Sequence, residues 1–218
     1  MTTPYSCILF DLDGTIVDSA PGITSTLAYM FERLGKPIPT PSELLQYVGP
    51  PLLDSFRDLA GFDAEESAVA LEIYREKYLN VGAYDATQYA GVGLVLKAVH
   101  ESPLRMSLAT SKPETPATLI LEHFNLARYF DVITGASDDE VRSAKKDVVA
   151  EALIRLEALG ADISRPVLVG DREHDVHGAA ANNVPTIFVD WGYGSLAEQA
   201  GAVAVVETPE ELQRLLLG

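Results

Sequence analysis

Residues 8–18 read ILFDLDGTIVD and place two carboxylates, Asp11 and Asp13, directly after an apolar run. That run, residues 6–10 (SCILF), lacks polar alternation, which is typical of a strand buried on both faces. Asp13-Gly14 is ordinary turn chemistry, but the charge of Asp11 at the end of an apolar strand is unfavourable without a cation or hydrogen-bond donors. The stretch therefore predicts a buried parallel strand that ends in a functional site.

Further apolar runs alternate with amphipathic stretches along the rest of the chain. This alternation is typical of a parallel sheet with crossover helices, so the sequence predicts an α/β fold with a doubly wound parallel sheet. The other expected strands are residues 105–109, 131–134, 166–169, 184–189 and 202–206, and the expected helices include residues 92–101, 115–127 and 145–159.

One interval, residues 19–84, contains only helix-like sequence and is too long for a single crossover helix. We expect a small helical domain at residues 19–85, inserted into an α/β core made of residues 1–18 and 86–218. Turn-rich stretches flank the insert, which indicates hinges between a lid and the core.

Composition narrows the function. The 218 residues are 47% hydrophobic and 22% charged, as in an ordinary globular protein, and the formal net charge is -16. Such a charge repels nucleic acid and anionic membrane surfaces, so we expect neither as a partner, and a small anionic substrate needs a local cation. A single cysteine, Cys7, and the lack of a long apolar run or signal pattern lead us to expect a cytoplasmic protein.

Polar residues follow other predicted strands, and a parallel sheet brings such strand ends to one edge. The stretch LATSKP supplies hydroxyls at Thr110 and Ser111, VLVGDREHD supplies Asp171 and Asp175, and VRSAKKDVV supplies Lys145 or Lys146. Carboxylate oxygens suit Mg²⁺, which is held by few protein ligands together with substrate phosphate.

This set of groups is suited to phosphoryl transfer through an aspartyl-phosphate. Asp11 would attack phosphorus, while Thr110 and the lysine would hold the transferred oxygens. Asp13 would protonate the leaving oxygen and then deprotonate the hydrolytic water. Lys112 would either contact phosphate or begin a solvated turn.

These residues resemble the haloacid dehalogenase superfamily of phosphatases over nearly the whole chain. The first motif of that family, Asp-x-Asp-Gly-Thr, stands here at residues 11–15, and its second, a Thr or Ser at a strand end, matches Thr110. Its third, a basic residue, matches Lys145 within RSAKKDVV, with Lys146 as the alternative. Its fourth, Gly-Asp-x-x-x-Asp, stands at residues 170–175.

The resemblance implies Mg²⁺ bound by the Asp11 carboxylate, the Asp13 backbone carbonyl, Asp171 and, directly or through water, Asp175. It also implies an α-helical cap and a place in the branch similar to phosphoglycolate phosphatases and 5′-nucleotidases. We expect further phosphate contacts from Gly14, Thr15, Ser111 and Lys112.

The expected function is therefore a Mg²⁺-dependent phosphatase acting on a small phosphorylated metabolite: a phosphoglycolate-like compound, a nucleoside monophosphate or a sugar phosphate. The third motif departs from the common Lys-Pro-x-Pro form, which leaves the substrate open. Two alternatives are a sugar-phosphate mutase of the same superfamily and a phosphoacceptor signalling domain. Either a monomer or a homodimer is consistent with the sequence.

Overall fold

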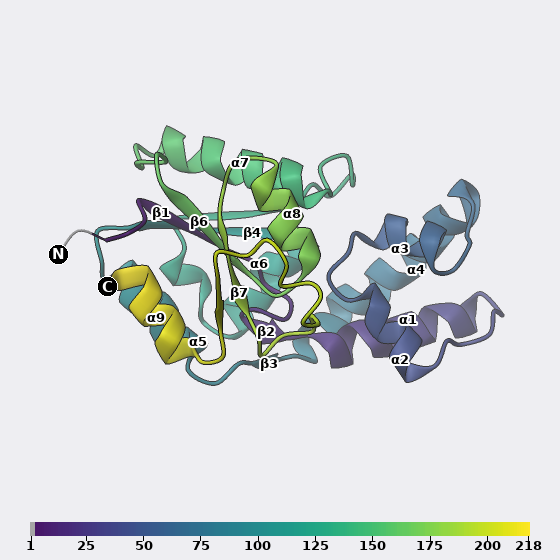
Figure 1. Cartoon of the computed structure of the whole chain (residues 1–218). Coiled ribbons are helices and arrows are strands. Elements are labelled where there is room, and N and C mark those ends of the chain that lie inside the picture. The colour runs from purple at the N-terminus through teal and green to yellow at the C-terminus, as the bar shows by residue number, and fades with distance from the viewer. Residues whose placement is uncertain (1–2) are drawn as a thin grey trace. The chain divides into compact units, whose positions relative to one another are not determined.

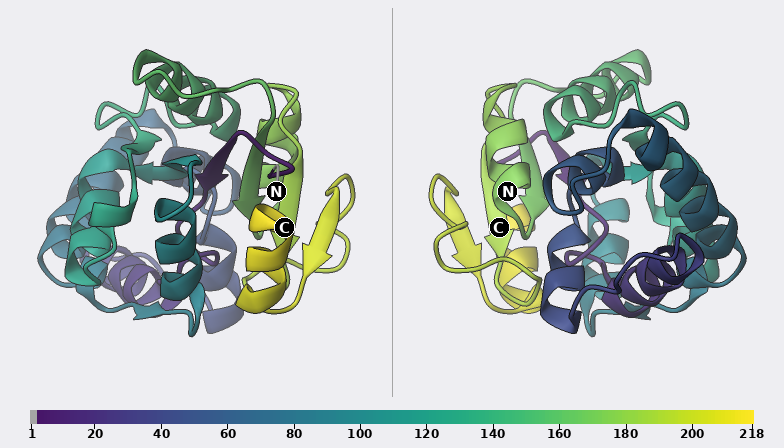
Figure 2. Two further views of the ribbon diagram at one scale, coloured as in Figure 1. Left: turned by 90° about the vertical axis from the view of Figure 1, so that its left-hand side faces the viewer. Right: turned by 90° about the vertical axis from the view of Figure 1, so that its right-hand side faces the viewer.

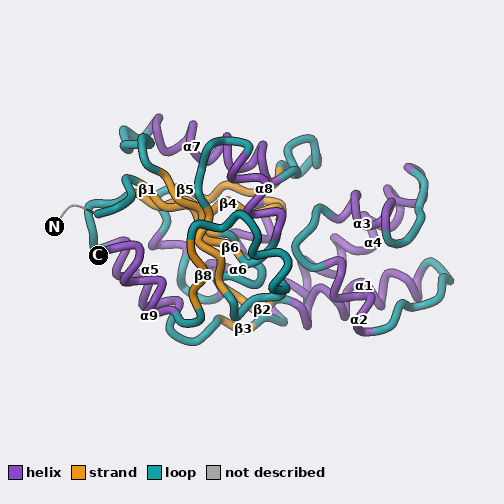
Figure 3. The backbone as a smooth tube through the Cα atoms, in the orientation of Figure 1, coloured by secondary structure: helices purple, strands orange, loops and turns teal. Residues whose placement is uncertain are grey.

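A computed structural model describes residues 3–218 (Figure 1). The chain divides into two compact units, one formed by Met1–Val17 and Gln88–Gly218, the other by Asp18–Thr87. Strands are concentrated in the first unit, and the second is almost entirely helical (Figure 3).

The first unit is built on a six-stranded sheet with the order β5-β4-β1-β6-β7-β8, in which the paired strands are parallel. From β1 the chain moves outward through β4 to β5 and then returns to the other side of β1 at β6. The order therefore reverses between β1 and β6, as in a doubly wound sheet, and the predicted fold class is confirmed. The strands are β1 (Cys7–Phe10), β4 (Arg105–Pro113), β5 (Val132–Ala136), β6 (Pro166–Gly170), β7 (Thr186–Val189) and β8 (Ala204–Val206).

Helices cover both faces of this sheet. Helices α7 and α8 pack against each other on one face, and α5 and α9 form a pair on the other (Figures 1 and 2). The helices are α5 (Val92–His100), α6 (Glu114–His123), α7 (Lys145–Ala158), α8 (Glu173–Ala180) and α9 (Pro209–Leu217), with a short 3-10 helix η3 (Ala127–Tyr129).

Burial on both faces explains the continuous apolar strands. Within β1, Cys7 and Leu9 belong to a core cluster that includes Val148 and Leu156 of α7. Side chains alternate along a strand, so Ile8 and Phe10 face the opposite side, and both are fully buried there. An alternating polar pattern would leave charges under one of the two helix layers.

Element boundaries differ from the sequence-based prediction in two informative places. β4 continues to Pro113, because its pairing with β5 shifts register after Ala109 and then resumes. Thr110 and Lys112 therefore lie within a bulged strand end and not in the loop after it. The helix predicted at residues 115–127 ends earlier, as α6, and Asn125 just beyond it has a φ of 59°, a backbone conformation that stops helices.

The second unit consists of helices that begin with strong capping residues. Asp63 and Glu66 form a capping box at the start of α4, and Thr40 and Glu43 form another at the start of α2. Its core includes an aromatic cluster of Phe31, Tyr47, Phe56 and Phe62. The elements are α1 (Ala20–Arg33), α2 (Pro41–Leu44), η1 (Leu45–Tyr47), α3 (Leu52–Asp58), α4 (Ala64–Asn80) and η2 (Gly82–Tyr84).

The two places where the chain passes between the units are short strands, β2 (Val17–Asp18) and β3 (Thr87–Gln88), which pair as a separate two-stranded sheet. Next to them, the Tyr89 backbone N–H donates to the carbonyl of Ile16 at 3.1 Å. The two crossing points are therefore held side by side.

Among residues 3–218, none of the helices has both the length and the apolar character that a membrane crossing requires.

Candidate active site

Asp11 and Asp171 lie at the point where the strand order reverses. Asp11 directly follows β1, Asp171 directly follows β6, and these two strands are neighbours in the sheet. The Asp11 backbone N–H continues the pairing by donating to the carbonyl of Val169 at 2.9 Å. Both carboxylates are buried, so the fold places two like charges in a low-dielectric environment at the edge where α/β proteins bind ligands.

Asp175 completes a cluster of three carboxylates. Asp11, Asp171 and Asp175 each offer one oxygen, and these oxygens all lie within 4.8 Å of one another. In the first turn of α8, Asp175 Oδ2 accepts the backbone N–H groups of Asp171 and Arg172, each at 3.1 Å. Its Oδ1 accepts no hydrogen bond of normal geometry from a described residue, although the Lys145 ammonium lies 2.8 Å away.

Lys145, the first residue of α7, supplies a cation to this cluster. Its Nζ donates to Asp11 Oδ1 at 2.6 Å and to the Ala109 carbonyl at 3.0 Å. Its stem passes over Gly178, where a Cβ atom would approach Lys145 Cγ to 2.5 Å. Lys146, the alternative lysine, is exposed, so the structure brings Lys145 and not Lys146 to the carboxylates.

Burial and mutual repulsion perturb the acidic groups. Desolvation raises the pKa of Asp171 well above its usual value, and the charges of Asp175 and Asp11 raise it further. Desolvation also raises the pKa of Asp175, although the nearby Lys145 opposes it. For Lys145, burial alone would lower the pKa, but the two facing carboxylates outweigh it and the pKa is raised, so the ammonium stays charged.

Asp13 has a cation of its own. Lys112 Nζ lies 3.0 Å from Asp13 Oδ2, and both side chains are buried. The bulged end of β4 makes this contact possible, and there the Lys112 backbone N–H donates to Thr110 Oγ1 at 3.3 Å. Thr110 and Ser111 are buried at the same strand end. Lys112 therefore lies buried within a strand and against Asp13, and does not begin a solvated turn.

Gly14 and Thr15 contact Asp171 in this structure. The Thr15 hydroxyl donates to Asp171 Oδ1 at 3.2 Å. Gly14 has a φ of 81°, and a Cβ atom there would come within 2.1 Å of Asp171 Oδ2. A side chain at position 14 would thus be excluded twice, by backbone strain and by collision.

A loop after β7 adds contacts that the sequence analysis missed. The backbone N–H of Tyr193 donates to Asp171 Oδ2 at 2.8 Å, and Trp191 Nε1 donates to the Thr15 carbonyl at 3.1 Å. Gly192 lies so close to Asp171 that a Cβ atom there would approach the Asp171 Cβ to 2.4 Å. The glycine-aromatic sequence WGYG signals a tight loop but does not reveal that its backbone holds a carboxylate.

The donor set fits a divalent cation. Three buried carboxylates face one another with one shared ammonium, and one oxygen of Asp175 lacks a hydrogen bond of normal geometry from any residue in the described range 3–218. A hard cation prefers such oxygen ligands, and its charge would offset the repulsion that raises the pKa of Asp171.

Fold and site together define a doubly wound α/β protein with a carboxylate-lysine centre at its switch point. The family model of haloacid dehalogenase-like hydrolases matches residues 8–189. The chain belongs to the haloacid dehalogenase-like hydrolase family, as its motifs predicted.

The chain is similar to known proteins that carry different functional names. It is 42% identical over 188 residues to the tyrosine-protein kinase PtkA of Mycobacterium tuberculosis, which covers 86% of this chain but 62% of that protein, so the chain spans less than two thirds of its length. It is 37% identical to a 5′-nucleotidase of Pseudomonas aeruginosa, covering 88% of this chain and 85% of the relative. A phosphoglycolate phosphatase of Pseudomonas syringae pv. syringae is 31% identical, with 97% and 78% covered. Among solved structures, a predicted phosphatase from Clostridium acetobutylicum is 39% identical and superposes with a TM-score of 0.89, with 96% of this chain and 97% of that chain covered.

Proposed function

We propose that this protein is a Mg²⁺-dependent phosphatase that hydrolyses a small phosphorylated metabolite through an aspartyl-phosphate. The observation that carries the proposal is the placement of Asp11, whose Oδ1 is held by Lys145 within a cluster of buried carboxylates. Membership of a hydrolase family and similarity to proteins named 5′-nucleotidase and phosphoglycolate phosphatase support it.

In this proposal Asp11 is the nucleophile. Lys145 holds its Oδ1, and in this proposal the other carboxylate oxygen attacks phosphorus. The attack forms the Asp11–phosphorus bond and breaks the bond from phosphorus to the substrate oxygen. Lys145 and the Thr110 hydroxyl would bind the transferred phosphoryl oxygens as charge spreads over them.

Asp13 is the proposed general acid and base. It would protonate the departing substrate oxygen and later take a proton from the water that hydrolyses the aspartyl-phosphate. Lys112 orients this carboxylate, since the two side chains form a buried ion pair at 3.0 Å. A bound Mg²⁺, held by Asp11, the Asp13 carbonyl, Asp171 and Asp175, would supply positive charge that offsets repulsion between phosphate and the acidic groups.

The first test is Asp11→Asn compared with Asp13→Asn, with released phosphate measured with and without Mg²⁺. We expect Asp11→Asn to lower kcat by at least about 10³-fold without unfolding the protein, because an amide is a poor nucleophile. Asp13→Asn should also slow turnover while still allowing the aspartyl-phosphate to form, which intact-protein mass spectrometry after acid quenching would detect. A substantial residual rate in Asp11→Asn would reject Asp11 as the nucleophile.

The substrate class is proposed from the relatives. A panel should compare nucleoside 5′-monophosphates, phosphoglycolate and sugar phosphates, with kcat/KM as the measure, because two of these classes correspond to the names of similar proteins. We propose the helical unit, Asp18–Thr87, as the cap domain that selects among them.

A second candidate function is transfer of a phosphoryl group to protein tyrosine, which the similarity to PtkA favours. Incubation with ATP labelled at the γ-phosphate and a tyrosine-containing protein separates the two. Label in tyrosine would support a kinase, whereas Mg²⁺-dependent release of phosphate from monoesters with no labelled tyrosine would support the phosphatase.

A further inference from the structure

Arg142 stands three residues before Lys145 in the stretch RSAKKDVV, and no step proposed above uses it. It lies in the loop that leads from β5 into α7, and the first residue of α7 is the lysine that contacts Asp11.

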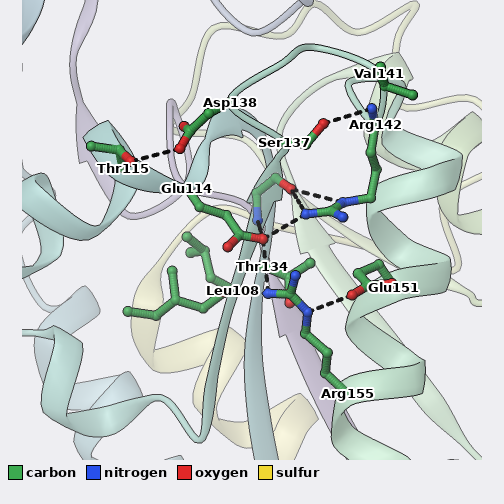
Figure 4. A network of polar contacts seen from close by, with 12 residues as sticks. Leu108, Glu114, Thr115, Thr134, Ser137, Asp138, Val141, Arg142, Glu151 and Arg155 are labelled. Atoms are coloured by element: carbon green, nitrogen blue, oxygen red, sulfur yellow. Dashed lines mark hydrogen bonds and ion pairs between the residues drawn. The ribbon is translucent and has the colours of Figure 1, made fainter.

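Arg142 is bound to Glu114, the first residue of α6. Glu114 Oε1 accepts a hydrogen bond from Arg142 at 2.7 Å, and Arg155 of α7 lies 2.9 Å from the same oxygen (Figure 4). Arg155 also donates to the Ile133 carbonyl of β5 at 3.2 Å. One carboxylate thus links the start of α6, the loop before α7 and the body of α7.

The loop itself is closed on Arg142. The Ser137 backbone N–H donates to the Arg142 carbonyl at 2.8 Å, and the Arg142 backbone N–H donates to Ser137 Oγ at 2.9 Å. The Arg142 guanidinium also donates to the Gly135 carbonyl at the end of β5, at 3.3 and 3.4 Å. Figure 4 shows Glu114, Arg142 and Arg155 converging beside this strand end. Hydrogen bonds therefore hold both the backbone and the guanidinium group of Arg142 in place.

The same cluster lies next to the second lysine of the site. Lys112 is two residues before Glu114, and its carbonyl is so close to Gly135 that a Cβ atom there would approach it to 2.4 Å. Glu114 consequently sits where the segment carrying Lys112 meets the segment carrying Lys145. A shift at this junction would move either ammonium relative to Asp11 and Asp13.

The partial exposure of the Glu114–Arg142 ion pair indicates that its main contribution is to positioning and not to stability. The side chains of Glu114 and Arg142 are 32% and 25% exposed, and partly exposed ion pairs add little to global stability. Positioning is more sensitive, because a displacement of about 1 Å at reacting groups can lower a rate about 10²-fold.

We propose that Glu114 and Arg142 are positioning residues that hold the loop before α7 so that Lys145 meets Asp11 in the geometry needed for phosphoryl transfer. The inference rests on the proposed function. It assigns a role to an arginine that does not contact the carboxylate cluster itself.

The test compares five variants: Arg142→Ala, Arg142→Lys, Glu114→Ala, the double variant Glu114→Ala/Arg142→Ala, and Glu151→Ala as the matched control. Glu151 binds Arg155 at 2.7 Å in the same network but does not bind Glu114 or Arg142 among the described contacts. Kinetics would be measured with the best substrate of the panel at saturating Mg²⁺, with orthovanadate inhibition as a probe of phosphoryl-oxygen binding.

We expect Arg142→Ala to lower kcat about 10- to 100-fold and to weaken vanadate inhibition, with the melting temperature nearly unchanged. Arg142→Lys should recover part of the loss, since one cation can still reach Glu114. If the two residues act as a unit, the double variant should be no slower than the slower single variant. The kcat of Glu151→Ala should stay within about twofold of the wild-type value.

Hydrogen exchange gives a readout that does not depend on turnover. Amides of residues 143–149 should exchange at least about 10-fold faster in Arg142→Ala than in Glu151→Ala. Unchanged exchange and unchanged kcat in Arg142→Ala would overturn the inference, as would an equal loss in Glu151→Ala. Failure of the proposed function looks different: the unchanged protein would release no phosphate, while the exchange comparison would still report on the loop.

Discussion

At the scale of single residues, the decisive feature is that one lysine faces three buried carboxylates. Lys145 contacts Asp11 and Asp175, whereas Asp171 is held by a hydroxyl and a backbone N–H and has a strongly raised pKa. Without a cation the charged form of Asp171 destabilises the fold, because the group binds its proton more tightly when folded than when unfolded.

Asp171→Asn should therefore stabilise the metal-free protein. An asparagine can still accept from Tyr193 N–H and donate to Thr15 Oγ1, so the loop contacts survive while the charge is removed. We expect a gain of about 1 kcal/mol, or roughly 2–4 °C in melting temperature, together with loss of the stabilisation by millimolar Mg²⁺ that we expect for the wild-type protein.

The pH dependence of this gain has a definite sign. The pKa of Asp171 is raised on folding, so the penalty is present above the folded pKa and disappears as pH falls through it and the carboxyl group is protonated. The difference in melting temperature between Asp171→Asn and the wild-type protein, measured by calorimetry, should therefore become smaller at acidic pH. A metal-free variant that melts below the unchanged protein at neutral pH would contradict this account.

At the scale of turns and helices, the glycine after Asp13 decides whether Asp171 keeps its place. Gly14→Ala would put a Cβ atom 2.1 Å from Asp171 Oδ2 in a backbone conformation that alanine disfavours. Gly35→Ala is a matched control, since Gly35 also has a positive φ, 63°, but has nothing within 4 Å of the added atom. We expect both to lose about 1 kcal/mol to strain, and Gly14→Ala alone to lose the response of its melting temperature to Mg²⁺. Equal behaviour of the two variants would show that the collision is relieved without moving Asp171.

The start of α8 is anchored by Glu198. Its carboxylate accepts from Arg172 Nε at 2.7 Å and from the backbone N–H groups of Glu173 and Ser195. This links α8 to the loop whose Tyr193 N–H holds Asp171.

The anchor should make stability acid-sensitive. Burial would raise the pKa of Glu198, but the bonds from Arg172 and the backbone outweigh it and the pKa is lowered. Its contribution is therefore present above the unfolded pKa of about 4.3 and is lost as pH falls through the folded pKa. Glu198→Gln should lower the free energy of unfolding by about 1–2 kcal/mol at pH 7 and much less near pH 3, measured from urea midpoints. A deficit that is the same at both pH values would rule out the charge as its source.

The sequence reveals those parts of fold and site that depend on local pattern. The strands of the α/β unit are apolar because helices cover both faces. Asp11 and Asp171 directly follow two of these strands, where polar groups are conspicuous, and Asp175 lies four residues after Asp171 in the first turn of α8. The sequence pattern does not reveal contacts between residues that lie far apart along the chain. The choice between Lys145 and Lys146 depends on how α7 faces the sheet, and the Tyr193 contact uses a backbone N–H that no side chain marks.

Strand boundaries follow the same distinction. The extension of β4 to Pro113 requires a register shift against β5, which is a property of the pair and not of either sequence. Strands β2 and β3 have two residues each, which is too few to show a periodicity in the sequence. Each is a strand only because it pairs with the other, which lies far away along the chain.

At the scale of the whole molecule, the residues proposed for chemistry all belong to one of the two units. The site residues from Asp11 to Asp175 lie in Met1–Val17 and Gln88–Gly218, and the helical unit is one continuous segment. The two points at which the helical segment interrupts the first unit lie close together, because the Tyr89 backbone N–H donates to the Ile16 carbonyl. A short loop can therefore join them.

Replacing residues 18–87 with a Gly-Ser linker of about four residues should leave a folded α/β unit whose melting temperature still rises with Mg²⁺. We expect it to hydrolyse p-nitrophenyl phosphate within about 10-fold of the full chain, while kcat/KM values for different natural monophosphates become nearly equal, because substrate selection is proposed for the helical unit. Adding Asp11→Asn to the shortened protein controls for turnover at another site. A folded shortened protein that keeps the selectivity of the full chain would remove the helical unit from substrate choice, and one that no longer responds to Mg²⁺ would place a needed metal-binding group within residues 18–87.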